Sequence, residues 1–138
     1  MNRSREYAQR LMQRARDDRY AMVRLAEDPQ SPPWTIAFHA QQAVEKAIKA
    51  VLSAGSIEYP YTHDLERLLE LVAASGRSLP PDRRELPTLT PFGATLRYEE
   101  TAPPPAATPV DRAWAVAAVR RTIDWAEMLL GREAQAGP

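Results

Sequence analysis

Apolar residues recur every three to four positions in four separate stretches of the chain, which is the spacing of one face of an α-helix. These stripes run from Ala8 to Leu25, from Ala37 to Val51, from Leu65 to Val72 and from Val116 to Leu130. No stretch of useful length alternates apolar and polar residues as a half-buried β-strand does. The pattern therefore predicts an all-α protein.

Prolines mark where these helices end, because proline lacks the backbone N–H and clashes with the preceding helical turn. The chain has 13 prolines, and they leave four proline-free stretches rich in Ala, Leu, Arg and Glu. We predict an up-and-down four-to-five-helix bundle in one domain spanning residues 1–138. The predicted helices cover about 3–28, 34–54, 63–75 and 110–131, and a long Pro-rich loop at 77–109 precedes the last one.

Several residues predict the helix ends. Gly55 is a candidate stop for the second helix. Thr62 is a candidate N-cap for the third, with Asp64 in its first turn, where the helix dipole favours negative charge. Asp111 is a candidate cap for the last helix, and residues 82–86 are expected to form one short turn in the loop.

Composition narrows the class of protein. The 138 residues include no cysteine, which excludes a cysteine-based zinc site, a disulfide scaffold and a catalytic cysteine. The longest apolar runs are too short to span a bilayer, and the N-terminus has no signal-peptide core, so we expect a cytoplasmic protein without a membrane partner. Net charge is zero, yet residues 1–24 carry seven arginines against three acidic residues. This excess is either a solvated helix face or a local basic surface.

The second predicted helix carries polar residues among its alanines. They are His39, Gln42, Glu45, Lys46 and Lys49. Helical spacing puts positions 39, 42 and 46 together on one side of the helix, and it also brings positions 42, 45 and 49 together. They form either an ordinary polar edge or a site. Asp18 falls on the apolar seam of the first helix, so it either has a partner, for which His39 is a candidate, or lies at the solvent-exposed edge of the seam.

Two segments carry a family resemblance. FHAQQAVEKAIKAVL at 38–52 is followed ten residues later by THDLERLLELV, and together they resemble the HEPN domain family. Asp18 matches an acidic position of that family's first helix, and Leu96-Arg97-Tyr98 agrees with a feature late in the loop. The other matching positions are Phe38, Gln41, Gln42, Ala43, Glu45, Lys46, Ala47, Lys49, Ala50, Thr62, His63, Asp64 and Leu65.

The resemblance implies a small helical bundle that commonly dimerises. Such proteins are often encoded beside a minimal nucleotidyltransferase, in pairs that behave as toxin–antitoxin modules. Many members are metal-independent RNases that use an arginine separated from a histidine by four to six intervening residues. The positions where that arginine would stand hold Pro32, Pro33 and Trp34 before His39, and Ser56, Ile57 and Glu58 before His63. The linear RNase motif is therefore absent.

Two functions follow from the resemblance, and the missing motif favours the first. The first is a dimeric binding module that pairs with a minimal nucleotidyltransferase and contacts a nucleotide or RNA phosphate. Its candidate binding residues are Asp18, His39, Gln42, Glu45, Lys46, Lys49, His63, Asp64, Arg97 and Tyr98. In this binding module, positive charge for binding an anion comes from Lys46, Lys49 and Arg97. Directional hydrogen bonds come from Gln42 and His63.

The candidate dimer interfaces of this first function are the Ala-rich side of the second helix and the last helix with Trp114 and Trp125. The alternative function is an RNase toxin with a non-standard site, where His39 or His63 transfers the proton and Arg97 or Lys46 binds the phosphate. His63 could instead only hydrogen-bond within its own turn. We predict no cofactor and no metal, because no H-x-x-x-H or H-E-x-x-H spacing occurs.

Overall fold

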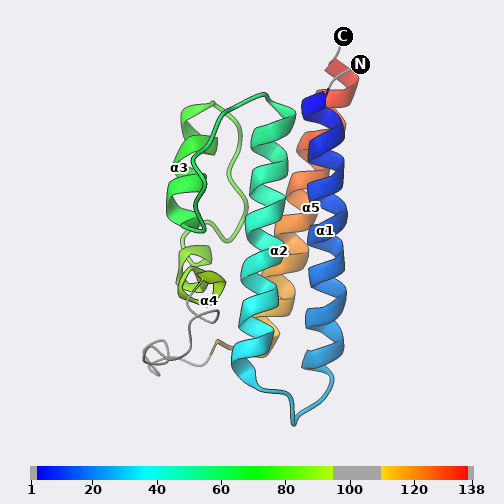
Figure 1. The fold of residues 1–138 in the computed structure, drawn as a ribbon, viewed down its shortest axis with the longest axis vertical. Coiled ribbons are helices and arrows are strands. Elements are labelled where there is room, and N and C mark those ends of the chain that lie inside the picture. Colours follow the sequence, from blue (N-terminus) through cyan, green and yellow to red (C-terminus); the bar gives the residue numbers. More distant parts are fainter. Residues whose placement is uncertain (1–2, 95–109, 137–138) are drawn as a thin grey trace.

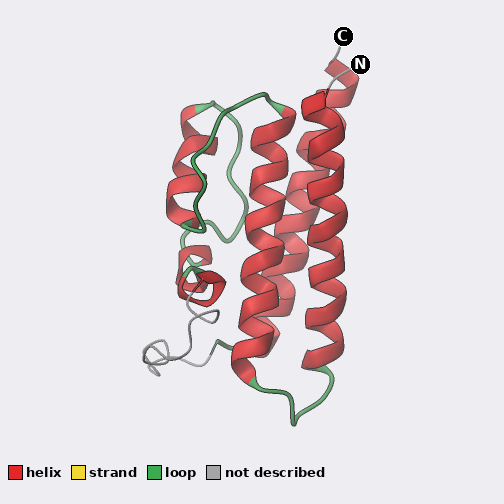
Figure 2. Cartoon of the chain, viewed as in Figure 1, coloured by secondary structure: helices red, strands yellow, loops and turns green. Residues whose placement is uncertain are grey.

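The computed structural model describes residues 3–94 and 110–136. Within these ranges the chain is helical and contains no strand, which confirms the all-α prediction (Figure 2). The helices are α1 (Arg3–Ala26), α2 (Pro33–Ala54), α3 (Leu65–Ala74), α4 (Pro91–Ala94) and α5 (Arg112–Ala136), with a 3₁₀ turn, η1, at Leu86–Leu89 (Figure 1). The three long helices α1, α2 and α5 stand side by side, and the short elements cover the other side of α2.

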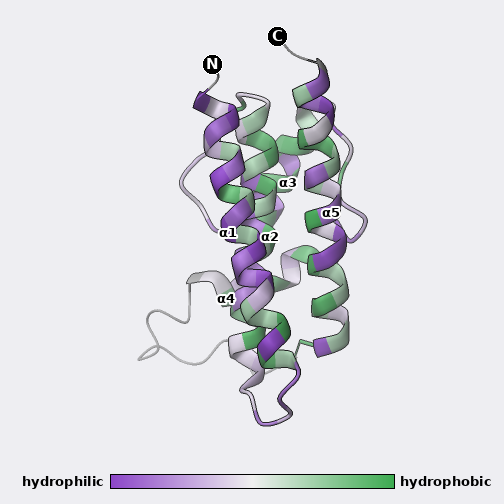
Figure 3. Cartoon of the chain, turned by 90° about the vertical axis from the view of Figure 1, so that its right-hand side faces the viewer, coloured by the Kyte–Doolittle hydropathy of each residue, from purple (hydrophilic) through white to green (hydrophobic). Residues whose placement is uncertain are grey.

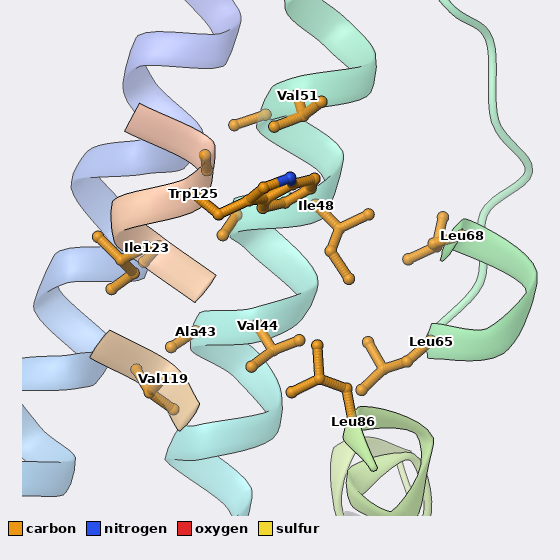
Figure 4. Packing of buried hydrophobic residues seen from close by; sticks show 14 of the residues in the cluster. Ala43, Val44, Ile48, Val51, Leu65, Leu68, Leu86, Val119, Ile123 and Trp125 are labelled. Carbon is orange, nitrogen blue, oxygen red and sulfur yellow. The ribbon is translucent and has the colours of Figure 1, made fainter. Parts of the chain in front are cut away.

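Helix α2 is the centre of the bundle because it packs against every other element. Its alanines from Ala37 to Ala50 are fully or almost fully buried, and their small side chains let neighbouring helices approach closely. Ile48 and Val44 fill the space between α5 and the α3–η1 side (Figure 4). The outer helices α1 and α5 mix hydrophilic and hydrophobic residues along their lengths (Figure 3). No helix of the described ranges is long and apolar enough to cross a membrane.

The Ala-rich side of α2 is therefore internal and does not form a dimer interface. Trp125 is likewise buried, and its indole Nε1 donates to the Ser78 carbonyl at 3.0 Å. Trp114 is only partly buried against the core. The apolar residues that suggested these interfaces therefore pack in or against the hydrophobic core of the monomer.

Four helix ends differ from the sequence-based prediction by two or more residues, and two of these differences have a clear physical reason. Helix α3 begins at Leu65, because Asp64 and not Thr62 is the N-cap: the Asp64 carboxylate accepts hydrogen bonds from the N–H groups of Glu66 and Arg67. Thr62 Oγ1 instead accepts from the Asp64 N–H at 3.0 Å. Helix α5 continues to Ala136, since a single mid-helix glycine such as Gly131 costs only about 1 kcal/mol.

The end of α2 is formed by Gly55 and Ser56 together. Gly55 is the C-cap, but its φ is −89°. The left-handed residue is Ser56, with φ 56°. The Ile57 N–H closes the turn on the Leu52 carbonyl at 2.9 Å, which satisfies one of the last carbonyls of the helix.

The segment after α3 is tied to α5, although the sequence predicted it to be mostly irregular. Turns run through 81–85, in agreement with the short turn predicted at 82–86, and η1 and α4 follow. Buried Asp82 forms two hydrogen bonds with the Arg121 guanidinium, at 2.8 and 2.9 Å. Asp111 caps α5, accepting from the Ala113 N–H at 2.8 Å.

Candidate functional site

The polar residues of α2 lie in two adjoining networks. In the first, Asp18 of α1 faces His39 and Lys46 of α2. One carboxylate oxygen of Asp18 is 3.0 Å from His39 Nδ1, and the other accepts from Lys46 Nζ at 2.6 Å. The side chains are 13%, 25% and 23% exposed for Asp18, His39 and Lys46. The acidic residue on the seam of α1 thus joins the two helices.

The second network is centred on buried Glu45. Its Oε2 accepts from Lys49 Nζ at 2.8 Å, and its Oε1 lies 2.8 Å from His63 Nδ1 and accepts from Gln41 Nε2 at 2.9 Å. His63 therefore does not close a hydrogen bond within its own turn. It reaches back across the gap between α3 and α2, because the chain between 55 and 64 returns alongside α2.

Two glutamines complete this second network. Gln42 Nε2 donates to Gln41 Oε1 at 2.6 Å, and Gln41 Nε2 also reaches the His63 carbonyl at 3.3 Å. Both glutamines are buried, and Gln41 is completely enclosed. Gly93 of α4 lies directly over Gln41, so closely that a Cβ at this position would be 2.4 Å from the amide carbon. The glycine is what allows α4 to pack onto the glutamine.

Aromatic rings surround the lysine of the second network. Lys49 Nζ is 5.7 Å from the Tyr59 ring centroid and 5.8 Å from that of Tyr61. These are cation–π distances. Tyr59 is half-buried, but Tyr61 is 92% exposed and stacks edge-on to His63 at 6.0 Å. The site therefore ends at an aromatic side chain that projects into solvent.

The lysines stabilise the ionised form of both carboxylates. Burial alone would raise the pKa of Asp18, but the hydrogen bonds and charges of His39 and Lys46 outweigh it and hold the pKa below its ordinary value of 3.8. Burial likewise opposes ionisation of Glu45. Hydrogen bonds with Lys49, Gln41 and His63 nevertheless hold its pKa below the ordinary 4.5. Two anions therefore face two cations.

This charge balance changes the chemistry expected from the sequence. Lys46 and Lys49 are each neutralised by a carboxylate at hydrogen-bond distance, so neither is a free cation awaiting a phosphate. Both histidines direct Nδ1 to a carboxylate, which leaves Nε2 as the ring nitrogen available to another group. The site offers directional hydrogen bonds on a surface of nearly zero net charge.

The remaining predicted residues fall elsewhere. Asp64 is occupied in capping α3. Arg97 and Tyr98 lie outside the described residues. No group of three or more histidine, aspartate and glutamate side chains that could hold a metal ion occurs in the described part of the chain.

Sequence reasoning missed three residues of the site. Gln41 was noted only as part of the family pattern, although it links Glu45 to His63. Tyr59 and Tyr61 were not singled out, because they lie in a connection and their ring contacts with Lys49 depend on how that connection folds. The spacing Tyr-Pro-Tyr just before Thr62 was the signal available.

The fold and the site together define a class: a helical bundle whose central helix carries a polar network instead of a purely apolar seam. The chain matches the HEPN domain over residues 8–129 and belongs to the HEPN domain family. Neither the comparison with curated proteins nor the comparison with solved structures finds a match.

The two networks make the stability of the protein depend on acid pH. Because the folded-state pKa values of Asp18 and Glu45 are lowered, the unfolded chain binds more protons than the folded chain in acid. Their contribution is complete above the ordinary values of 3.8 and 4.5 and is lost as the pH falls through the folded-state values. We therefore expect the urea concentration at the unfolding midpoint to decrease as the pH is lowered below about 5.

Urea unfolding of variants at several pH values tests this dependence. Asp18→Asn should flatten the acid decline, because one of the two perturbed carboxyls is gone. Asp17→Asn is the matched control, since Asp17 is exposed and accepts a hydrogen bond from exposed Gln13 on the same helix. An acid decline in Asp18→Asn as steep as that of the unaltered protein would contradict the assignment.

Proposed function

We propose that this HEPN domain is a non-catalytic assembly module that forms a homodimer and pairs with a minimal nucleotidyltransferase in a toxin–antitoxin-type pair. The observation that carries the proposal is the internal neutralisation of the α2 site. Both lysines are ion-paired with buried or half-buried carboxylates, so the surface they present suits a specific protein contact better than a phosphate chain.

The arginines of α5 add support. Arg121 is committed to Asp82, and Arg120 pairs with Asp124 at 3.7 Å on the exposed side of the helix. An RNase of this family needs an arginine beside its histidine to stabilise the charge that develops on the phosphate. Both carboxylate-bound histidines instead adjoin lysines whose charge is already balanced.

Tyr61 is the proposed anchor of the dimer. A side chain that is 92% exposed beside an ordered polar network is a typical centre for a protein interface, since tyrosine buries a large apolar ring and offers one hydroxyl. Around it, Lys49 and His63 supply polar contacts at the rim. The Nε2 atoms of His39 and His63, whose Nδ1 atoms are held by carboxylates, are then the candidate groups for contact with a nucleotide.

Light scattering and an RNA incubation test the proposal together. The purified chain, 15.5 kDa as a monomer, should have the mass of a dimer at micromolar concentration. Co-expression with a minimal nucleotidyltransferase encoded beside it should give a complex that survives size exclusion. The same preparation should leave single-stranded RNA intact in EDTA.

Two results would overturn this function. A monomer mass across the micromolar range would remove the dimer. RNA cleavage in EDTA that is lost in His63→Ala or His39→Ala would establish the RNase instead, with the carboxylate-bound histidine as the proton-transfer group.

A further inference from the structure

Five of the seven arginines of α1 form two sets that face different ways. One set packs toward α5: Arg5 donates to the Glu133 carbonyl at 3.3 Å, and Arg16 pairs with Glu127 at 2.7 Å. The other set, Arg3, Arg10 and Arg14, is exposed and has no acidic partner in the part of the chain that the structure describes. Only the first set is explained by the fold.

The second set forms a continuous stripe. Spacings of seven and four residues put Arg3, Arg10 and Arg14 on one face of the helix, over about 16 Å of its length. Tyr7 lies on the same face, is 46% exposed, and has the Arg10 guanidinium 5.8 Å above its ring. The view in Figure 3, from the α1 side, shows mainly hydrophilic residues along this helix. We call these four residues the α1 stripe.

The stripe leads into a pocket at the end of the bundle. This pocket has a volume of about 320 Å³ and is formed where α1 begins and α2 ends. Its lining includes Arg3 and Tyr7 of the stripe, and it also includes Ser4, Ser53 and Ser56. A ligand that follows the stripe therefore reaches a concave end lined by serines.

Acidic residues on the same side decide which class of ligand fits. Glu6 and Asp17 neighbour the stripe on α1, and Glu58 lines the pocket. They would repel an unbroken row of phosphates. The same acidic residues are compatible with a peptide whose carboxylates are separated along its length and lie opposite the arginines. The zero net charge of the whole chain also disfavours a polyanion.

We propose that the α1 stripe and its pocket are a docking surface for an acidic segment of a partner protein. The carboxylates of that segment are spaced to meet Arg14, Arg10 and Arg3 in turn, and its end enters the serine-lined pocket. This surface is made of residues other than Tyr61, although Tyr7 interacts with the neighbouring Tyr59, so it goes beyond the proposed dimer and its peptide test does not require that dimer.

Fluorescence anisotropy with designed peptides tests the docking surface on the full chain. The probe is a labelled Ala/Gln peptide carrying three glutamates with the four- and seven-residue spacing of the arginines. The comparison peptide has the same composition with its glutamates adjacent. We expect saturable binding of the spaced peptide, weakened about tenfold by Arg10→Glu combined with Arg14→Glu.

The matched control reverses the same number of charges elsewhere. Arg67→Glu combined with Arg84→Glu alters exposed arginines on the α3 side and should change the affinity less than about twofold. Equal binding of the two peptides, or equal losses of affinity in the two double variants, would show that binding depends on overall charge alone and would overturn the proposal.

Tighter binding of single-stranded oligouridine than of the spaced peptide would overturn the proposal in favour of a nucleic-acid ligand. A monomeric protein that still binds the spaced peptide would overturn only the dimer.

Discussion

Glu45→Ala is expected to lower the free energy of unfolding by about 3 kcal/mol, because removing one member of a buried ion pair leaves the other charge uncompensated. The Glu45 side chain is 6% exposed and accepts hydrogen bonds from Lys49 and Gln41, with His63 at 2.8 Å. Lys49, only 13% exposed, would keep its charge with tyrosine rings as its remaining neighbours. Urea unfolding at neutral pH measures the loss.

Two further variants separate this network from ordinary truncation. Glu45→Gln keeps the size and one acceptor oxygen, so its loss should be clearly smaller than that of Glu45→Ala. Glu70→Ala removes an exposed carboxylate of α3 whose closest cation is 3.8 Å away, and it should cost less than about 0.5 kcal/mol. A loss below about 1 kcal/mol for Glu45→Ala would show that the network contributes little to folding.

Tyr61→Ala is expected to weaken the homodimer about thirtyfold, which corresponds to about 2 kcal/mol and is typical of an aromatic anchor at the centre of an interface. The folded monomer should hardly change, since the ring is 92% exposed and its contacts with Lys49 and His63 lie at the surface. Sedimentation equilibrium over a concentration series measures the dimer constant, and thermal unfolding of the monomer checks the fold.

Tyr20→Ala is the matched control for this experiment. Tyr20 is 66% exposed, and the Arg24 guanidinium lies 5.3 Å from its ring centroid in the last two turns of α1. Its removal should leave the dimer constant unchanged. Equal weakening by both substitutions would mean that the dimer does not form around Tyr61.

Part of the site could be anticipated from helical spacing. A carboxylate at Asp18, on an otherwise apolar seam, predicted either a partner, with His39 as the candidate, or a place at the solvent-exposed edge of the seam. The i,i+4 pair of Glu45 and Lys49 follows from the geometry of one helix and forms as spacing predicts. Spacing could not show that Glu45 is buried, which turns a weak surface pair into the centre of a network.

The rest of the site depends on contacts between segments distant in the sequence. His63 meets Glu45 only because the connection from α2 to α3 folds back along α2. Gln41 is enclosed because Gly93, more than fifty residues later, packs over it. Lys49 lies near the rings of Tyr59 and Tyr61 for the same reason as His63.

The sequence by itself determined the helices, their family and the polar character of α2, because helical periodicity, proline placement and a short motif are local properties. It determined the cap at Asp111 as well. Only the tertiary structure decided which charges are already neutralised, which alanine and tryptophan faces are internal, and which arginines of α1 remain available. These outcomes depend on burial and on the distance between atoms of different elements, and hydrogen bonds and ion pairs change their strength steeply with both.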